Sequence, residues 1–245
     1  MIPSDGLIVP DWPAPGRVKA LQTTRLGGVS LPPYDSLNLG DHVGDDPQAV
    51  MRNRMRLSTL MPSEPVWLQQ VHGIEVADAD LACCVPRADA CVARRGVCVV
   101  MTADCLPVLL CDRAGTVVGA VHAGWKGLAA GVIEAAVGAM RVPPQNLIAW
   151  LGPAISQQAF EVGAEVRDAF VSQNPHADSA FLHATNGKYL ADLYLLARQR
   201  LNALGIFDIY GGDRCTYRES GQFFSYRRDG ATGRQGSFIW IEPER

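Results

Sequence analysis

The feature that most constrains the fold is a pair of apolar runs, 106–111 and 116–121, on either side of a short polar segment that ends in glycine. Two such runs around a four-residue loop predict a β-hairpin. If residue 111 pairs with residue 116, Cys105 lies directly opposite His122, with their Cβ atoms roughly 4.5–5.5 Å apart. At that separation a thiolate and an imidazole can bind one metal ion or act as a nucleophile and its base.

A third candidate ligand, His72, follows a strand predicted at 66–71 and precedes a glycine, a position typical of active-site loops. A lone histidine is more often structural. Together, however, His72, Cys105 and His122 form a ligand set that suits zinc or copper and leaves one coordination position open. Asp104 is a candidate proton acceptor or partner of a metal ligand, and capping of the bend before the strand is its alternative role.

Composition limits the classes of fold and partner. The 245 residues, of which 48% are hydrophobic and 19% charged, suffice for one large domain or two small ones. A net charge of -3 gives no general attraction to nucleic acid or to an anionic membrane. Any anion site must therefore be local, and the partner is predicted to be a small molecule.

Cysteine usage and hydropathy bear on the compartment. The seven cysteines are an odd number without C-x-x-C spacing, which favours a reducing environment. No apolar run approaches the roughly 20 residues that a membrane span needs, and the first residues lack the pattern of a secretory signal. The sequence thus predicts a cytoplasmic protein without a membrane span.

Four cationic side chains in glycine-containing loops are candidate anion-binding residues. Arg25 precedes a pair of glycines, and Lys126 stands at the start of a predicted helix, where free backbone amides favour anions. The segment 223–234 adds Arg227 and Arg234 beside aromatic residues and glycines, a combination that can stack a ring and pair with phosphate or carboxylate. For each of them, a solvated side chain in an ordinary loop is the alternative.

The remaining segments are predicted to form the scaffold. Asp46 as N-cap and Pro47 at the first helical position are typical of a helix start. The apolar stripe of this helix, which is expected to pack in the core, consists of Val50, Met51, Met55 and Leu60. The other predicted elements are strands at 17–23, 148–151 and 238–241 and helices at 128–140, 161–173 and 189–204.

Seven motifs occur in an order that resembles the YfiH family. They are T-T-R-x-G-G-V-S at 23–30, L-N-L-G at 37–40, Q-V-H-G at 70–73, A-D-C-L-P-V at 103–108, H-A-G-W-K-G at 122–127, G-P-A-I at 152–155 and F-F-S-Y-R-R-D-G-x-T-G-R at 223–234. Members of this family have been called laccase-domain proteins, polyphenol oxidases, purine nucleoside phosphorylases and peptidoglycan editing factors. The resemblance spans nearly the whole chain.

The resemblance implies a single α+β domain over residues 1–245, with mixed β-sheets flanked by helices, similar to the cysteine hydrolases that include bacterial cytotoxic-necrotizing-factor toxins. It also implies that His72, Cys105 and His122 are metal ligands, with zinc as the usual occupant and copper as another. Asn38 and Gln70 join the candidate substrate-binding residues because they lie in the family's motifs. Lys126 replaces an arginine that many relatives carry, which keeps the charge but loses the bidentate fork.

The first functional hypothesis from the resemblance is purine nucleoside phosphorolysis, with adenosine deamination and S-methyl-5'-thioadenosine cleavage at the same centre. Deamination suits zinc because a metal-bound hydroxide needs a lowered water pKa and a nearby acid-base group such as Asp104. Phosphorolysis requires an anion site, for which Arg25, Lys126, Arg227 and Arg234 are candidates. The expected partners are a purine nucleoside and phosphate, without nucleic acid or membrane, and the protein is expected to be a monomer or a homodimer.

Several alternatives remain open at this stage. One is a peptidoglycan-precursor amidase that removes L-serine from a UDP-linked muramyl sugar. A metal-binding regulatory module with structural zinc is another, and Cys105 acting as a metal-independent nucleophile with His122 as its base is a third. Copper-dependent phenol oxidation ranks last, because one His-Cys-His centre and five histidines in all are too few for a multicopper oxidase.

Overall fold

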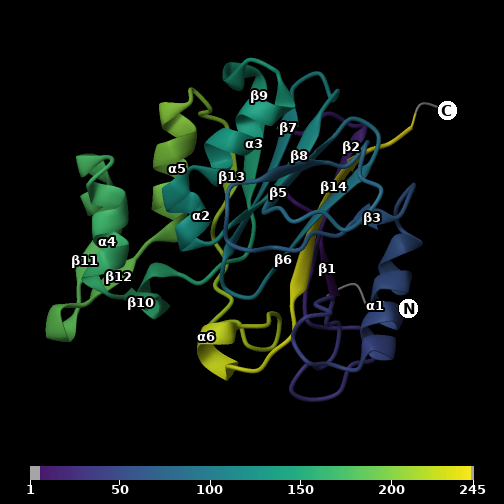
Figure 1. Cartoon of the computed structure of the whole chain (residues 1–245), viewed down its shortest axis with the longest axis horizontal. Coiled ribbons are helices and arrows are strands. Elements are labelled where there is room, and N and C mark those ends of the chain that lie inside the picture. The colour runs from purple at the N-terminus through teal and green to yellow at the C-terminus, as the bar shows by residue number, and fades with distance from the viewer. Residues whose placement is uncertain (1–5, 244–245) are drawn as a thin grey trace.

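The computed structural model describes residues 6–243 and has two β-sheets that pack face to face, with helices on their outer sides (Figure 1). In the five-stranded sheet the order is β1 (Leu7–Ile8), β2 (Val18–Thr23), β14 (Gln235–Ile241), β6 (Val97–Thr102) and β3 (Pro65–Val66). In the six-stranded sheet it is β13 (Ile209–Gly211), β9 (Leu147–Leu151), β7 (Leu106–Asp112), β8 (Val118–Ala123), β5 (Ala90–Ala93) and β4 (Val76–Asp78). A third sheet contains β10 (Glu161–Val162), β12 (Tyr189–Ala191) and β11 (Phe181–His183).

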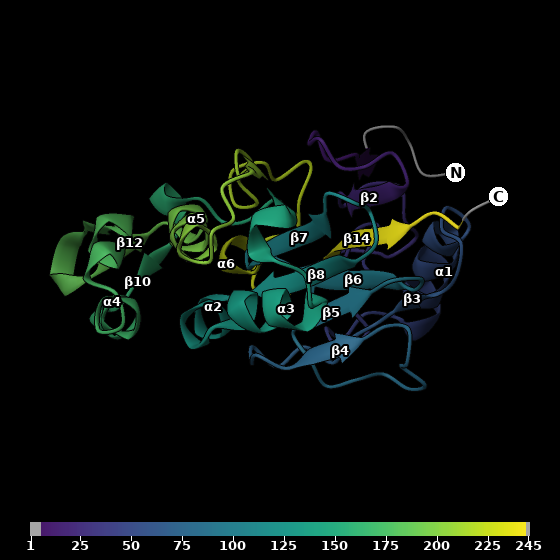
Figure 2. The ribbon, with the colours of Figure 1, turned by 90° about the horizontal axis from the view of Figure 1, so that it is seen from above.

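The α-helices of the described residues are α1 (Pro47–Ser58), α2 (Trp125–Ala130), α3 (Val132–Met140), α4 (Ala164–Val171), α5 (Leu193–Ala203) and α6 (Tyr226–Asp229). Helix α1 packs on the five-stranded sheet, and α2 and α3 cover the six-stranded sheet (Figure 2). Parallel pairs such as β3 with β6 and β13 with β9 occur among antiparallel ones, so both large sheets are mixed. The α+β architecture that the resemblance implies is therefore confirmed. Within residues 6–243, no helix has the length and apolar character that a membrane span requires.

Strand alternation fixes what faces the space between the two large sheets. On β6, Val97 and Val99 face α1, whereas Cys98 and Val100 belong to the apolar cluster between the sheets. We call this cluster, which also contains Leu109, Cys111 and Ala120, the inter-sheet layer. Both faces of these strands are buried, which explains why their sequences are continuous apolar runs rather than alternating ones.

The predicted hairpin forms, but its register differs from the expected one by two residues. Pro107, rather than Cys105, lies opposite His122, and Cys111 lies opposite Val118. The cause is Asp112, whose carboxylate accepts hydrogen bonds from the amides of residues 116 and 117 and thereby extends β7 by one residue. Because the shift is an even number of residues, Cys105 and His122 still point to the same face.

The helix at Pro47 starts as predicted, since the Asp46 side chain accepts from the Gln48 amide at 3.0 Å. Of its predicted apolar stripe, Val50 is buried as expected, but the prediction is wrong for Met51, Met55 and Leu60, which are 55%, 60% and 48% exposed. The buried residues of α1 are Ala49, Val50, Asn53 and Leu57. Asn53 donates to Ser30 Oγ and to the carbonyls of residues 36 and 38, so a polar side chain decides which face is buried.

Several helices and strands begin or end at other residues than the sequence predicts, in two cases because a glycine or a capping aspartate interrupts the apolar pattern. The helix predicted at 128–140 begins at Trp125 and breaks at Gly131, which adopts φ +102°. The helix predicted at 189–204 begins only after Asp192 caps it, because residues 189–191 form β12. Similarly, residues 161 and 162 form β10 before α4, and the strand predicted at 66–71 is reduced to Pro65–Val66. The strands predicted at 17–23, 148–151 and 238–241 are present.

Candidate metal centre

His72, Cys105 and His122 meet at one end of the inter-sheet layer. His122 projects from β8, Cys105 lies in the bend before β7, and His72 lies in the loop after β3. Their ligand atoms all lie within 4.8 Å of one another, and Cys105 Sγ is 3.8 Å from His72 Nε2. The set of one sulfur and two imidazole nitrogens fits a zinc ion with an open fourth position.

A buried carboxylate that the sequence analysis missed holds both histidines. Asp89, which is fully buried, accepts from His122 Nδ1 at 2.8 Å and from the His72 and Gly73 amides at 2.9 and 2.6 Å. The bond to Nδ1 leaves Nε2 of His122 for a metal ion, as in carboxylate–histidine–metal arrangements. The amide bonds also stabilise His72 at φ +61°, a left-handed conformation that is rare for residues other than glycine.

Cys105, just before β7, and His122, on β8, favour opposite charges. Burial alone raises the pKa of the Cys105 thiol, but the positive charge and hydrogen bonds of His122 and His72 lower it overall to about 6. Burial lowers the pKa of His122, but the Cys105 charge and the Asp89 hydrogen bond raise it overall to about 9. In the metal-free protein this favours a thiolate, which is also the form of cysteine that binds metals.

Two glycines of the H-A-G-W-K-G motif permit the close approach of α2 to the ligands. A Cβ atom at Gly124 would lie 2.8 Å from His72 Cδ2 and 3.1 Å from Cys105 Sγ. At Gly127 it would lie 2.8 Å from the Gly73 carbonyl oxygen. Because real Cβ atoms avoid such distances, a side chain at either position would push the helix away from the centre.

Asp104 points toward the C-terminal segment. Its two carboxylate oxygens accept hydrogen bonds from Thr216 Oγ1 at 2.6 Å and from the Arg227 amide at 2.7 Å. Asp104 also has a left-handed backbone, at φ +93°. The contacts show that this side chain joins the ligand loop to the start of α6. A role for Asp104 in proton transfer stays a prediction.

A cavity of about 400 Å³ opens beside the three candidate ligands, and Arg234 is its cationic residue. The Arg234 amide donates to Asn38 Oδ1 at 2.9 Å, and its guanidinium donates to the carbonyls of Thr232 and Gly233. Asn38 therefore fixes the backbone of Arg234 and does not itself line the cavity. Burial lowers the pKa of Arg234 from its usual value, although the charges of Cys105 and Asp104 oppose this.

A second, more apolar cavity of about 130 Å³ shares Ala103, Cys105 and Tyr226 with the first. Its walls include Trp125, Phe160, Ile155 and Leu193. Arg227 lies at this cavity, with its guanidinium carbon 5.3 Å from the centre of the Phe160 ring and one donor bound to the Glu161 carbonyl. The two cavities thus present different chemistry to the same cysteine.

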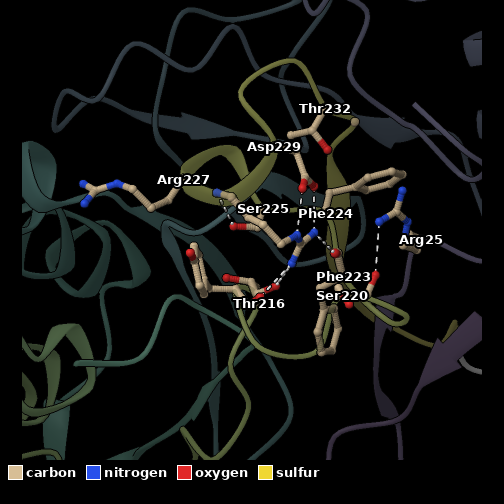
Figure 3. Close-up of polar contacts among 12 residues, drawn as sticks. Arg25, Thr216, Ser220, Phe223, Phe224, Ser225, Arg227, Asp229 and Thr232 are labelled. Atoms are coloured by element: carbon tan, nitrogen blue, oxygen red, sulfur yellow. Dashed lines mark hydrogen bonds and ion pairs between the residues drawn. The ribbon is translucent and has the colours of Figure 1, made fainter. Parts of the chain in front are cut away.

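The structure places other predicted site residues in structural contacts. Arg25 donates to the carbonyls of Asp35 and Ser220 and lies over the Phe224 ring, away from both cavity linings (Figure 3). Lys126 is exposed, with its ammonium 5.7 Å from the Trp125 ring centre. Gln70 borders the larger cavity, but its amide is paired with both backbone groups of Met101.

The third arginine of the C-terminal segment is also structural. Arg228 donates to the carbonyls of Thr216, Tyr217 and Phe223 and forms an ion pair with Asp229 (Figure 3). These bonds join the turn at 215–217 to the segment before α6. The clustering of arginines in 223–234 therefore has two causes, because one holds the loop and two border cavities.

The position of Asp89 in the sequence indicates that its carboxylate is buried and needs hydrogen-bond partners. A charged residue stands directly before the wholly buried strand β5, and buried carboxylates require partners. His42 and Thr102, which also line the larger cavity, carried no comparable signal, because nothing in their local sequence indicates proximity to Cys105.

The chain has near full-length relatives, at more than 50% identity, among both characterised proteins and solved structures. It is 57% identical over 240 residues to the Escherichia coli protein named purine nucleoside phosphorylase YfiH, covering 96% of this chain and 98% of that one. It is 58% identical over 240 residues to the Shigella flexneri protein of the same name, with the same coverage. The crystal structure of a Neisseria meningitidis protein superposes with a TM-score of 0.95 at 53% identity, covering 97% of this chain and all of that one.

A more distant crystal structure, YlmD from Geobacillus stearothermophilus, has a TM-score of 0.87 at 32% identity and covers 93% of each chain. The family model described as multi-copper polyphenol oxidoreductase laccase matches residues 19–242, which include all three candidate ligands and both cavities. The chain therefore belongs to the YfiH, or laccase-domain, family.

Proposed function

We propose that the protein is a purine nucleoside phosphorylase whose reaction takes place beside a zinc ion held by His72, Cys105 and His122. The observation that supports this most is the pair of adjoining cavities, one apolar and one cationic, that meet at Cys105 and Tyr226. The base of a nucleoside is a largely apolar ring, which suits the apolar cavity, and phosphate is an anion, which suits the cationic one. Phosphorolysis requires that the two substrates meet at C1' of the ribose. The relatives named as purine nucleoside phosphorylases are identical to this chain at more than half of the 240 aligned residues.

The apolar cavity is suited to the purine base. Trp125 and Phe160 offer ring faces or edges for packing, and Leu193 adds an aliphatic side chain to the same lining. Arg227 uses one donor on the Glu161 carbonyl, and its other N–H groups are available for acceptor atoms on the edge of the purine. Adenosine and S-methyl-5'-thioadenosine present the same kind of base, so both belong among the substrates to be tested.

The larger cavity is suited to phosphate, because Arg234 supplies a positive charge that burial keeps away from bulk solvent. In the reaction, a phosphate oxygen forms a bond to C1' of the ribose while the bond from C1' to the base nitrogen breaks. The electron pair of that bond leaves with the base, which takes up a proton. The products are ribose 1-phosphate and the free base. When bound, zinc would supply a Lewis acid beside this carbon.

The contacts of Asp104 support a positioning role in this scheme. Its carboxylate holds the Arg227 amide and Thr216 Oγ1, so it determines where Arg227 borders the base cavity. Asp104→Asn should therefore raise KM for the nucleoside more than it lowers kcat. A loss confined to kcat, with a changed pH profile, would instead indicate that Asp104 transfers the proton.

The test is turnover of zinc-loaded protein with inosine or adenosine and phosphate, followed by chromatography of the products. Wild type should release free base and ribose 1-phosphate in equal amounts. Cys105→Ala should lose zinc and activity by at least a hundredfold, whereas Cys83→Ala, an exposed cysteine outside the linings of both cavities, should retain both. Release of base with free ribose would identify a hydrolase, and absence of turnover would refute the proposal.

A further inference from the structure

Thr102 is a buried residue that lines the larger cavity and whose hydroxyl lacks a partner among the described residues. It ends β6, is 1% exposed, and its Oγ1 has no hydrogen bond to any of residues 6–243. Two buried polar residues of the neighbouring strand β14 are paired, since Ser237 Oγ donates to Gln22 and Gln235 bonds to both backbone groups of Phe224. The Thr232 hydroxyl also lacks a partner among the described residues, but Thr232 does not line the cavity. A buried hydroxyl without a partner costs free energy, so it calls for a physical explanation.

Strand alternation directs this side chain toward the candidate metal centre. Thr102 continues the series of Cys98 and Val100, which face the inter-sheet layer. His122 continues the corresponding series of Val118 and Ala120 on β8. Accordingly, Thr102 lines the same cavity as Cys105, His122 and Arg234.

Away from the candidate metal ligands, the charges that line this cavity favour an anion over a cation. Arg234 is its permanent positive charge. Burial and the charge of Arg234 lower the pKa of His42, which favours a neutral imidazole on the same wall. A threonine hydroxyl can donate one hydrogen bond to an anionic oxygen. Arg234 and Thr102 are therefore complementary to a tetrahedral oxyanion.

We propose that the Thr102 hydroxyl donates a hydrogen bond to the phosphate that attacks the nucleoside, and that Thr102 and Arg234 together form the phosphate subsite. This inference rests on the proposed function. It assigns the unpartnered hydroxyl to the phosphate rather than to the ribose. In the ligand-free protein the hydroxyl remains unsatisfied, and it gains its partner when phosphate enters.

The test compares Thr102→Val, which keeps the shape of the side chain and removes the hydroxyl, with Thr102→Ser, which keeps the hydroxyl. Both variants are prepared as zinc-loaded full-length protein, and the dissociation constant for inorganic phosphate is measured by calorimetry. KM is then measured separately for phosphate and for inosine. Thr102→Val should raise both the dissociation constant and KM for phosphate about tenfold, because hydrogen bonds to charged groups are the stronger ones. Thr102→Ser should stay within about threefold of wild type, since it retains the donor.

Stability measurements separate a binding role from a structural one. Without phosphate, Thr102→Val should melt at the wild-type temperature or higher and keep its zinc, because it replaces an unpartnered hydroxyl with a methyl group. A lower melting temperature would mean that the hydroxyl has a structural partner and would overturn the inference.

The kinetic outcomes distinguish the two proposals. Unchanged phosphate constants in Thr102→Val, or a rise in KM for inosine alone, would overturn the phosphate subsite while leaving the phosphorylase intact. If wild type binds phosphate through Thr102 but produces no ribose 1-phosphate, the proposed function fails and the subsite stands. If wild type neither binds phosphate nor turns over, both are refuted.

Discussion

The metal centre and the C-terminal segment 223–234 border the same cavities, but they position their side chains in different ways. At the centre, His122 and Cys105 lie on or beside paired strands, and the buried Asp89 fixes both histidines. In the C-terminal segment, the amides of Arg227 and Arg234 donate to Asp104 and Asn38, and their guanidinium groups donate to nearby carbonyls. The first arrangement combines strand pairing with a buried carboxylate, whereas the second depends mainly on hydrogen bonds between side chains and backbone groups.

This difference shows which charged residues are part of the scaffold. Asp89 and Arg228 both look like candidates for chemistry, yet each spends most of its hydrogen-bonding capacity on the protein backbone. Arg227 and Arg234 keep part of their guanidinium at a cavity. Whether a charged side chain lines a cavity therefore separates a binding role from a positioning role better than residue type does.

The largest expected effect concerns the Cys105 thiolate in the metal-free protein. Because His122 and His72 lower the pKa of Cys105 to about 6 overall, the thiolate should form at lower pH than in an ordinary cysteine. Alkylation of Cys105 after chelation, followed by peptide mass spectrometry between pH 5 and 10, should have a midpoint near pH 6. In His122→Ala the midpoint should rise by about two pH units or more. A midpoint above 8 in wild type would contradict the charge pairing at the centre.

The second prediction concerns Asp89. Asp89→Asn removes the negative charge that orients His122 and His72, so zinc affinity should fall about 10- to 100-fold. Competition with a chromogenic chelator measures this affinity. Asp80→Asn is a matched control, because Asp80 also accepts three backbone amides, from residues 94–96, without contacting the centre. Equal zinc loss in both variants would mean that the effect is general destabilisation.

The third prediction separates two adjacent arginines. Arg228→Ala should lower the free energy of unfolding by about 2 kcal/mol, because it leaves the carbonyls of Thr216, Tyr217 and Phe223 without their donor. Arg227→Ala should change stability by less than about 1 kcal/mol and raise KM for the nucleoside. Denaturant unfolding and steady-state kinetics measure the two effects. If the two variants lose stability equally, the separation into a loop-holding and a cavity-bordering arginine is wrong.

The sequence predicted those parts of the site that follow from strand periodicity and from motifs. The prediction that Cys105 and His122 point to the same face of the sheet is correct although the predicted register is wrong by two residues. An even shift in register keeps side chains on the same face. The roles of Asp89 and Asn38 were not predicted, because they depend on contacts between residues 17 and 196 positions apart. The prediction that the methionines of α1 pack in the core is wrong for a similar reason. The hydrogen bonds of buried Asn53 to distant residues, and not the apolar pattern of the helix, decide which face is buried.

The smallest expected effect is that of Lys126→Ala, and it tests where the cationic part of the site ends. Lys126 belongs to a family motif and stands in the first turn of α2, yet its side chain is exposed and outside the linings of both cavities. Since an exposed charge at this range is screened by solvent and salt, KM for phosphate should change by less than about twofold. Arg52→Ala, an exposed arginine on α1, gives the baseline for removing a surface charge. A tenfold rise in KM for phosphate in Lys126→Ala alone would mean that the anion site extends to the start of α2. Lys126 would then be a binding residue together with Arg234.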